Sequence, residues 1–216
     1  MAKECIQLKE RTINDSELEL LKNATELISN DKFQTDIGTS LELIDKIKND
    51  DLNNGVVLLN SEHFIAMPSL LANYCIQKYN TKRILVINWD TEHNTQLQND
   101  LYTNQKVLCC SIHRFESGKS ADGSDFYNNG DESGKGFNIN VPLTEAGYGD
   151  QEYMALFLNL LLPIFYEFSP QIIIVPSSFN ANTNGQMNVS STIFEHFLNY
   201  LTCLANGKIC LLINVT

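Results

Sequence analysis

The sequence predicts an α/β fold, a three-layer α/β/α sandwich whose sheet is mostly parallel. Short apolar segments, among them 83–90 and 172–180, alternate along the chain with longer segments of helical periodicity. Both segments contain an unbroken apolar run, 84–87 and 172–175, which is typical of strands buried on both faces. With 216 residues, 43% of them hydrophobic, and no clear linker or internal repeat, the chain is expected to form a single domain over 1–216.

The individual elements follow from local patterns. Asn14 or Asp15 is expected to cap the first helix, and Pro68 stands near the start of the third. A polar, glycine-rich loop is expected over 116–136, and a Leu- and Phe-rich core helix ends before Ser169-Pro170. The expected helices are 15–21, 39–47, 69–79, 95–102, 150–168 and 191–204. The expected strands are 56–59, 83–90, 107–114, 138–142, 172–180 and 208–213.

Charge and composition exclude several functions. The net charge of −11 argues against direct nucleic-acid binding, because a phosphate-binding surface needs a basic excess. The sequence contains no run of about 18 apolar residues, so no membrane span is expected. The first residues lack the apolar core of a signal peptide. The six cysteines show no CxxC spacing, so we expect buried free thiols in a reducing compartment. Adjacent Cys109 and Cys110 should point to opposite faces of a strand.

The candidate site lies where two buried strands end. Asp90 ends one of them and Asn180 ends the other, and α/β proteins keep their sites at the carboxyl ends of parallel strands. A metal hydrolase would favour carboxylates at both positions, and this chain has one acid and one amide. Glu92, two residues after Asp90, would share its face if the strand continued, and His93 follows. The alternative is that Asp90 and Glu92 bind loop backbone and helix N-termini.

Five blocks, in order, resemble the zinc-dependent histone deacetylase family, most closely its class II members. They are Arg83-Ile-Leu-Val-Ile-Asn-Trp-Asp90, Val107-Leu-Cys-Cys-Ser-Ile-His-Arg-Phe115, Gly136-Phe-Asn-Ile-Asn-Val-Pro142, Gly149-Asp-Gln-Glu-Tyr153 and Phe168-Ser-Pro-Gln-Ile-Ile-Ile-Val-Pro-Ser-Ser-Phe179. The resemblance implies the arginase/deacetylase fold, without the family's first strand and C-terminal helices. It also implies cleavage of acetyl groups from lysine, with zinc polarising the amide and activating water.

Carried over by residue, the resemblance implies a degenerate active site. The three zinc-ligand positions correspond to Asp90, Glu92 and Asn180, where the family has Asp, His and Asp. The family's histidine pair and its oxyanion tyrosine have no counterpart, and His63 is a lone histidine with no recognisable acid partner. No zinc is therefore expected. The family's structural monovalent cation implies a possible remnant of that site at Asp90, Ser111 and His113.

These residues lead to one hypothesis with two alternatives. The favoured function is a pseudoenzyme, a degenerate deacetylase-like domain that acts as an interaction or regulatory module in chromatin regulation. Its expected partners are proteins, such as an active deacetylase domain or a repressor complex, and its expected location is the nucleus, the cytoplasm or both. The alternatives are an active lysine deacetylase with an altered metal site and a binder of acetyl-lysine that does not cleave it.

Overall fold

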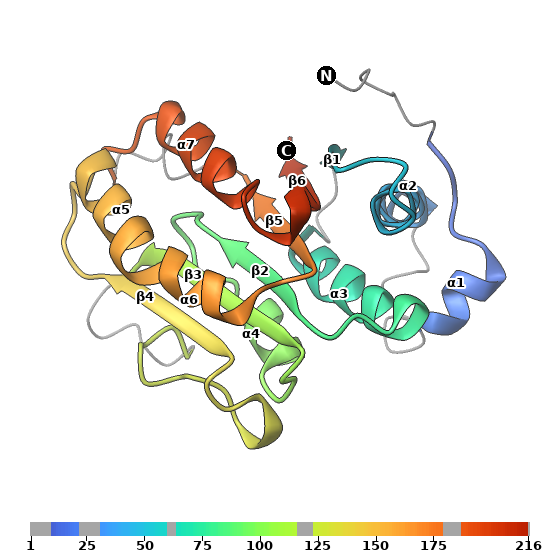
Figure 1. Cartoon of the computed structure of the whole chain (residues 1–216), viewed down its shortest axis with the longest axis horizontal. Coiled ribbons are helices and arrows are strands. Elements are labelled where there is room, and N and C mark those ends of the chain that lie inside the picture. The colour runs from blue at the N-terminus through green and yellow to red at the C-terminus, as the bar shows by residue number, and fades with distance from the viewer. Residues whose placement is uncertain (1–9, 22–30, 60–63, 116–122, 179–186, 216) are drawn as a thin grey trace.

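A computed structural model describes residues 10–21, 31–59, 64–115, 123–178 and 187–215. Within them, six parallel strands form one sheet in the order β1-β6-β5-β2-β3-β4 (Figure 1). The strands are β1 (Asn54–Leu59), β2 (Ile84–Asn88), β3 (Val107–Arg114), β4 (Asn138–Leu143), β5 (Ile172–Ser177) and β6 (Ile209–Asn214). The predicted parallel sheet is confirmed, although β2 and β5 end earlier than expected.

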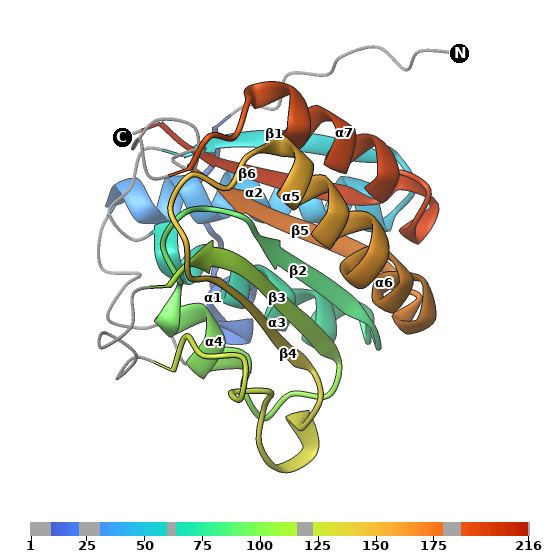
Figure 2. The ribbon, with the colours of Figure 1, turned by 90° about the vertical axis from the view of Figure 1, so that its left-hand side faces the viewer.

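Helices cover both faces of the sheet, as Figure 2 shows. On one face lie α2 (Asp31–Lys48), α3 (Met67–Tyr79) and α4 (Thr95–Leu101), with α1 (Asp15–Leu20) against α3. On the other lie α5 (Asp150–Leu156), α6 (Leu162–Phe168) and α7 (Ser191–Leu201). Short helical turns are η3 (Phe64–Ala66), η5 (Glu132–Gly134), η6 (Phe157–Leu161) and η8 (Ala205–Gly207). The predicted three-layer architecture is confirmed.

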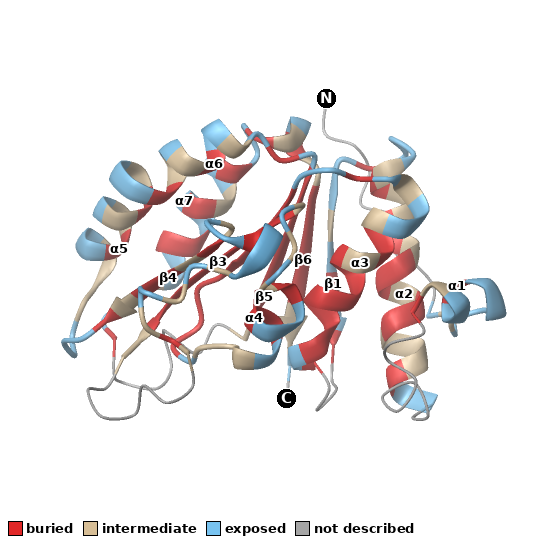
Figure 3. Cartoon of the chain, turned by 90° about the horizontal axis from the view of Figure 1, so that it is seen from below, coloured by how far each residue is buried: buried red, intermediate tan, exposed pale blue. Residues whose placement is uncertain are grey.

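Alternation along the strands divides the interior into two cores. Ile84 and Val86 pack toward α2 and α3, whereas Leu85 and Ile87 pack toward α5 and α7. Cys109 and Cys110 divide in the same way, which confirms their predicted opposite orientation. Figure 3 shows the buried strands in the middle layer and the buried helix surfaces turned toward them. Both faces of β2 and β5 are buried, which explains their unbroken apolar sequences.

Two helices differ from expectation. The second begins at Asp31 instead of residue 39, because Phe33 and Ile37 continue the buried stripe one turn at a time. The long helix from Asp150 to Phe168 is interrupted by the π-helical turn η6. Pro163 stands just after this turn and has no N–H for an α-helical bond, so the wider turn accommodates the missing donor.

The structure also tests the predictions for the first helix cap and for the glycine-rich loop. Asn14 caps α1, accepting a hydrogen bond from the Glu17 N–H in a capping box. In the loop predicted over 116–136, residues 116–122 lie outside the described ranges, and the remainder contains η5. That part is bonded to the chain after α4, since Asp131 N–H donates to the Tyr102 carbonyl. None of the helices in the described residues is long and apolar enough to cross a membrane.

Strand β1 forms one edge of the sheet and is only half covered. Its odd residues Val57 and Leu59 are buried toward α2 and α3. Its even residues Val56 and Leu58 are 54% and 65% exposed on the opposite face. The layer formed by α5, α6 and α7 therefore leaves this edge of the sheet open.

Candidate functional site

The candidate site lies beyond the carboxyl ends of β2, β3 and β5. Asp90 follows β2 by two residues and is only 7% exposed. Ser177 ends β5, the neighbour of β2 in the sheet, and Ser178 follows it. The parallel arrangement brings these side chains together across 87 and 88 residues of sequence. This is the edge at which the sequence predicted a site.

Hydrogen bonds from β5 hold both oxygens of the Asp90 carboxylate. Oδ1 accepts from Ser177 Oγ at 3.2 Å and from the Ser178 N–H at 3.1 Å. Oδ2 accepts from the same N–H at 2.8 Å and from Ser178 Oγ at 2.7 Å. A carboxylate offers about four lone-pair directions, and four contacts from three donors engage them. The predicted alternative, in which Asp90 binds loop backbone, is correct for the Ser178 N–H.

Trp89 holds the Ser177 hydroxyl in position beside Asp90. Its ring is fully buried between Phe194 and Phe197 of α7, with ring centroids 5.5 and 5.9 Å away. Its indole N–H donates to Ser177 Oγ at 3.0 Å. Because the indole nitrogen is only a donor, Ser177 Oγ accepts there and directs its own proton to Asp90. The α7 core thus orients the carboxylate through Trp89 and Ser177.

Asn88 folds the residues after β2 into a turn. Its side-chain oxygen accepts from the Asp90 N–H at 3.3 Å, and its amide nitrogen donates to the Glu92 carbonyl at 3.2 Å. The strand ends at Asn88, so the two-residue alternation of a strand does not extend to the following acids. Asp90 is buried, whereas Glu92 is exposed. The expectation that the two carboxylates share a face was therefore wrong.

The two described histidines of this region pack against each other at a tilt, beside the turn that contains Asp90. The rings of His93 and His113 lie 4.6 Å apart between centroids. His113 Nε2 donates to the Ser124 carbonyl at 2.8 Å, so its neutral form accepts at Nδ1 from Ser111 Oγ, also at 2.8 Å. Ser111 and His113, two of the three positions of the proposed cation remnant, are thus in direct contact. That remnant stays a prediction.

A buried amide network lies beneath the histidines, and sequence reasoning missed it. Gln98 Oε1 accepts from Asn138 Nδ2 at 3.0 Å and from Asn140 Nδ2 at 2.8 Å. The same oxygen lies 3.2 Å from His93 Nε2, which therefore donates. Gln98 Nε2 donates to the Gly123 carbonyl. The sequence did contain a signal for this network. Asn138 and Asn140 are two positions apart on β4, so both amides lie on one face of the strand.

Tyr153 completes the buried surroundings of Asp90. Its side chain is fully buried, and its hydroxyl has no hydrogen-bond partner among the described residues. Burial raises the pKa of Tyr153 above its ordinary value, and the negative charge of Asp90 raises it further. The phenol is therefore neutral across the physiological range and acts as a packing group on α5.

The remaining predicted positions are not placed. Asn180 and His63 both lie outside the described residues. Within the described ranges, no group of three or more His, Cys, Asp or Glu side chains is arranged to hold a metal ion. The site as described is a closed hydrogen-bonded cluster around Asp90, with the histidine and amide network next to it.

Comparisons with known proteins point to one family. A sequence model described as "Histone deacetylase domain" matches residues 64–214. The chain is 30% identical over 194 residues to "Polyamine deacetylase HDAC10" of Danio rerio, covering 82% of this chain and 29% of that protein. It is 31% identical over 191 residues to the HDAC10 of Rattus norvegicus, covering 80% and 32%. It is 33% identical over 165 residues to "Histone deacetylase HDA1" of Saccharomyces cerevisiae, covering 74% and 23%.

A solved structure supports the fold. The structure of the histone deacetylase Clr3 matches with a TM-score of 0.87 and 24% identity, over 96% of this chain and 41% of that chain. The chain thus spans less than a third of the length of the curated relatives above.

Proposed function

Since this chain belongs to the zinc-dependent histone deacetylase domain family, we propose that it is a catalytically degenerate member acting as an interaction or regulatory module. The fold of the family is retained, as the likeness to Clr3 indicates. The groups that would perform hydrolysis differ from the family pattern at several positions. The proposal is that the domain keeps its surfaces and has lost the reaction.

The observation that carries the proposal is the bonding of Asp90. A zinc ligand must direct an oxygen lone pair at the metal. Both oxygens of Asp90 accept hydrogen bonds from Ser177 and Ser178 instead. A zinc ion at Asp90 would displace at least one of these donors, from buried Ser177 or half-buried Ser178, at a cost of up to about 1–3 kcal/mol.

The chemistry of the other two positions supports the same conclusion. Glu92 replaces a histidine, and its side chain is exposed while Asp90 is buried. Asn180 replaces a carboxylate with a neutral amide, a much poorer zinc donor. The donor set therefore does not fit the zinc ion of the family, and no hydrolytic step through zinc belongs to the proposed function. No cofactor is proposed for the domain.

The proposed partners are proteins, such as an active deacetylase domain or a repressor complex, with a role in chromatin regulation. The proposed location is the nucleus or the cytoplasm. The acidic charge of −11 supports protein partners over direct binding of nucleic acid.

The alternative is an active metal-dependent deacetylase, and the relatives named polyamine deacetylases favour it. A polyamine is a cation, which suits a chain of net charge −11. Under this alternative, metal binding would rearrange the contacts of Asp90 with Ser178.

Metal analysis combined with a deacetylation assay tests the proposal. The purified chain is incubated with zinc, desalted, and measured for bound metal and for acetate release from acetyl-lysine peptides and N-acetylated polyamines. We expect zinc well below one ion per chain and no release. The matched variant Glu92→His with Asn180→Asp restores the family's ligand types and should bind more zinc than the parent chain. Stoichiometric zinc with chelator-sensitive turnover in the parent chain would overturn the proposal.

Calorimetry with acetylated peptides tests the remaining possibility, a domain that recognises acetyl-lysine without cleaving it. Heat of binding that disappears with the unacetylated peptide would identify such a reader, whereas no heat at millimolar peptide would remove it from consideration.

A further inference from the structure

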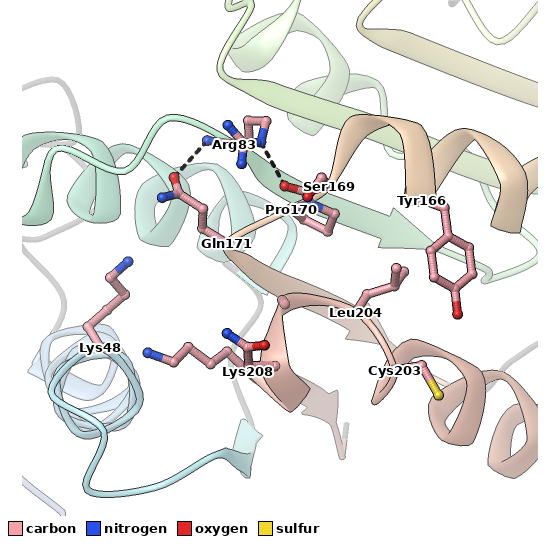
Figure 4. Close-up of a pocket in the computed structure, with 11 residues that line it drawn as sticks. Lys48, Arg83, Tyr166, Ser169, Pro170, Gln171, Cys203, Leu204 and Lys208 are labelled. Carbon is pink, nitrogen blue, oxygen red and sulfur yellow. Dashed lines mark hydrogen bonds between the residues drawn. The ribbon is translucent and has the colours of Figure 1, made fainter.

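A second pocket lies at the opposite end of the sheet from Asp90. It has a volume of about 470 Å³, within the range of about 300–1,000 Å³ that small-molecule sites occupy. Its walls come from the residues before β2, β5 and β6 and from the ends of α2, α6 and α7. Figure 4 shows Lys48, Arg83 and Lys208 around one side, with Gln171 between them and Tyr166 on the other side.

The three cations of this pocket are incompletely paired. Lys48 has no ion-pair partner within the described residues, and its ammonium lies 5.7 Å from the centre of the Tyr79 ring. Arg83 uses Nε to donate to the Ser169 carbonyl at 2.7 Å, and its two terminal nitrogens have no partner in the described part of the chain. Lys208 forms an ion pair at 2.6 Å with Asp50, whose side chain is 77% exposed.

This concentration of positive charge is unexpected in a protein with net charge −11. Partial burial lowers the pKa of the Lys48 ammonium, and the nearby Lys208 lowers it further, against opposing effects of Cys75 and Asp50. Two ammonium groups held close enough to repel each other cost free energy in the absence of an anion. In Figure 4 both lysines extend into the same space.

The partial negative charges at the helix C-termini around this pocket oppose anion binding. Helices α2, α6 and α7 end at Lys48, Phe168 and Leu201, and each C-terminus carries about half a negative charge. Together with the solvent-screened Asp50, these offset part of the three positive charges and leave an excess. The unpaired donors of Lys48 and Arg83, and the side-chain amide of Gln171, remain directed at the pocket.

We propose that this pocket binds the phosphate group of a small phosphorylated molecule, between Lys48, Lys208 and the terminal nitrogens of Arg83. A phosphate dianion has enough charge and enough oxygens to engage two ammonium groups and a guanidinium at once. The space toward Tyr166 and Cys203 accommodates the organic part of the molecule. The site is independent of the proposed loss of deacetylase chemistry.

Calorimetric titration of the full 216-residue chain with inorganic pyrophosphate at pH 7 and low salt tests the proposal. We expect one submillimolar site whose affinity falls with added salt. Lys48→Gln and Lys208→Gln should each weaken binding about tenfold, as expected for one hydrogen bond to a charged group. Lys135→Gln removes the same charge from an exposed loop outside the pocket and should change the affinity less than about twofold.

A measurement on the unaltered protein does not depend on the variants folding. Carbon-13 NMR of labelled lysine side chains should show the pKa of Lys48 rising when pyrophosphate is added. If the three cations only neutralise the helix ends, low-millimolar pyrophosphate will not bind and no lysine pKa will move, which overturns the proposal. Equal weakening by Lys135→Gln would also overturn it. Tighter binding of citrate, or of an acidic peptide, than of pyrophosphate would refute the assignment to phosphate.

Discussion

Replacing Asp90 by asparagine tests the proposed role of its carboxylate as a structural anchor. In the parent chain, three donors from Ser177 and Ser178 make four contacts with its two oxygens. An asparagine keeps one acceptor oxygen and turns an NH₂ group toward at least one of those donors. At about 1.5–3 kcal/mol for each hydrogen bond to a charged group, the loss of one or two bonds should cost about 1.5–6 kcal/mol of unfolding free energy.

Urea unfolding at pH 7, followed by circular dichroism, measures this cost. With a denaturant slope of about 2 kcal/mol/M, the midpoint should fall by about 1–3 M. Asp150→Asn is the matched control, because Asp150 also accepts from the N–H and the hydroxyl of a single serine, Ser190. Asp150 is less buried than Asp90, so water can replace part of its bonding and the variant should lose only about 1 kcal/mol.

The sign of the Asp90→Asn effect separates the two functional readings. In a metal site without its metal, neutralising a ligand carboxylate relieves repulsion, so stability would stay constant or rise. An unchanged or higher midpoint, or a loss no larger than that of Asp150→Asn, would refute the anchoring role of Asp90.

Three further predictions concern neighbouring groups. Gln98→Met should cost about 1–3 kcal/mol in the same urea assay, because Asn138 Nδ2 keeps only the Asn128 carbonyl as acceptor, whereas Asn140 Nδ2 keeps two carbonyls; a cost below about 0.5 kcal/mol would contradict the network. Tyr153→Phe should leave stability unchanged or raise it by up to about 1 kcal/mol, because the removed hydroxyl has no partner in the described residues, and a clear loss of stability would show that it has one. Among the five described cysteines, exposed Cys203 should react with a thiol reagent in the folded state. Burial raises the pKa of Cys75 and Cys109 to about 12, so few thiolates form and both should react only after unfolding; rapid labelling of either at pH 8 would contradict their burial.

Much of the fold could be predicted from the sequence because its strands are buried on both faces. Segments such as 172–175 are apolar throughout and stand out without any knowledge of their neighbours. The start of α2 at Asp31 was missed because its first two turns present only Phe33 and Ile37 to the core among polar residues. The π-helical turn before Pro163 arises because proline has no backbone N–H to donate within the helix. The spacing of apolar residues carries no information about such a turn.

The position of Asp90 in the site could also be predicted, whereas its partners could not. A strand's end is a local property, and the carboxylate there was evident from the chain. Ser177 and Ser178 stand nearly 90 residues away, and their pairing depends on which strand lies beside β2. Glu92 was misplaced for the opposite reason. The prediction for Glu92 assumed that the alternation of the strand continued past Asn88. The side chain of Asn88 instead bonds to the backbone of Asp90 and Glu92 and forms a turn.

The strand order has a consequence for the way the chain reaches its native state. Strand β1 pairs with β6, and the residues joined in that ladder are about 155 positions apart in sequence. During synthesis, β2, β3 and β4 can associate as soon as they emerge, but β1 has no neighbour until the last strand has been made. Until then, one side of the β1 backbone has no hydrogen-bonded neighbour, and the strand carries the exposed apolar side chains of Val56 and Leu58. Strand β1 is therefore made before the other strands of the described sheet but pairs only after β6 has been made. We expect folding to be slow and vulnerable to aggregation at that edge.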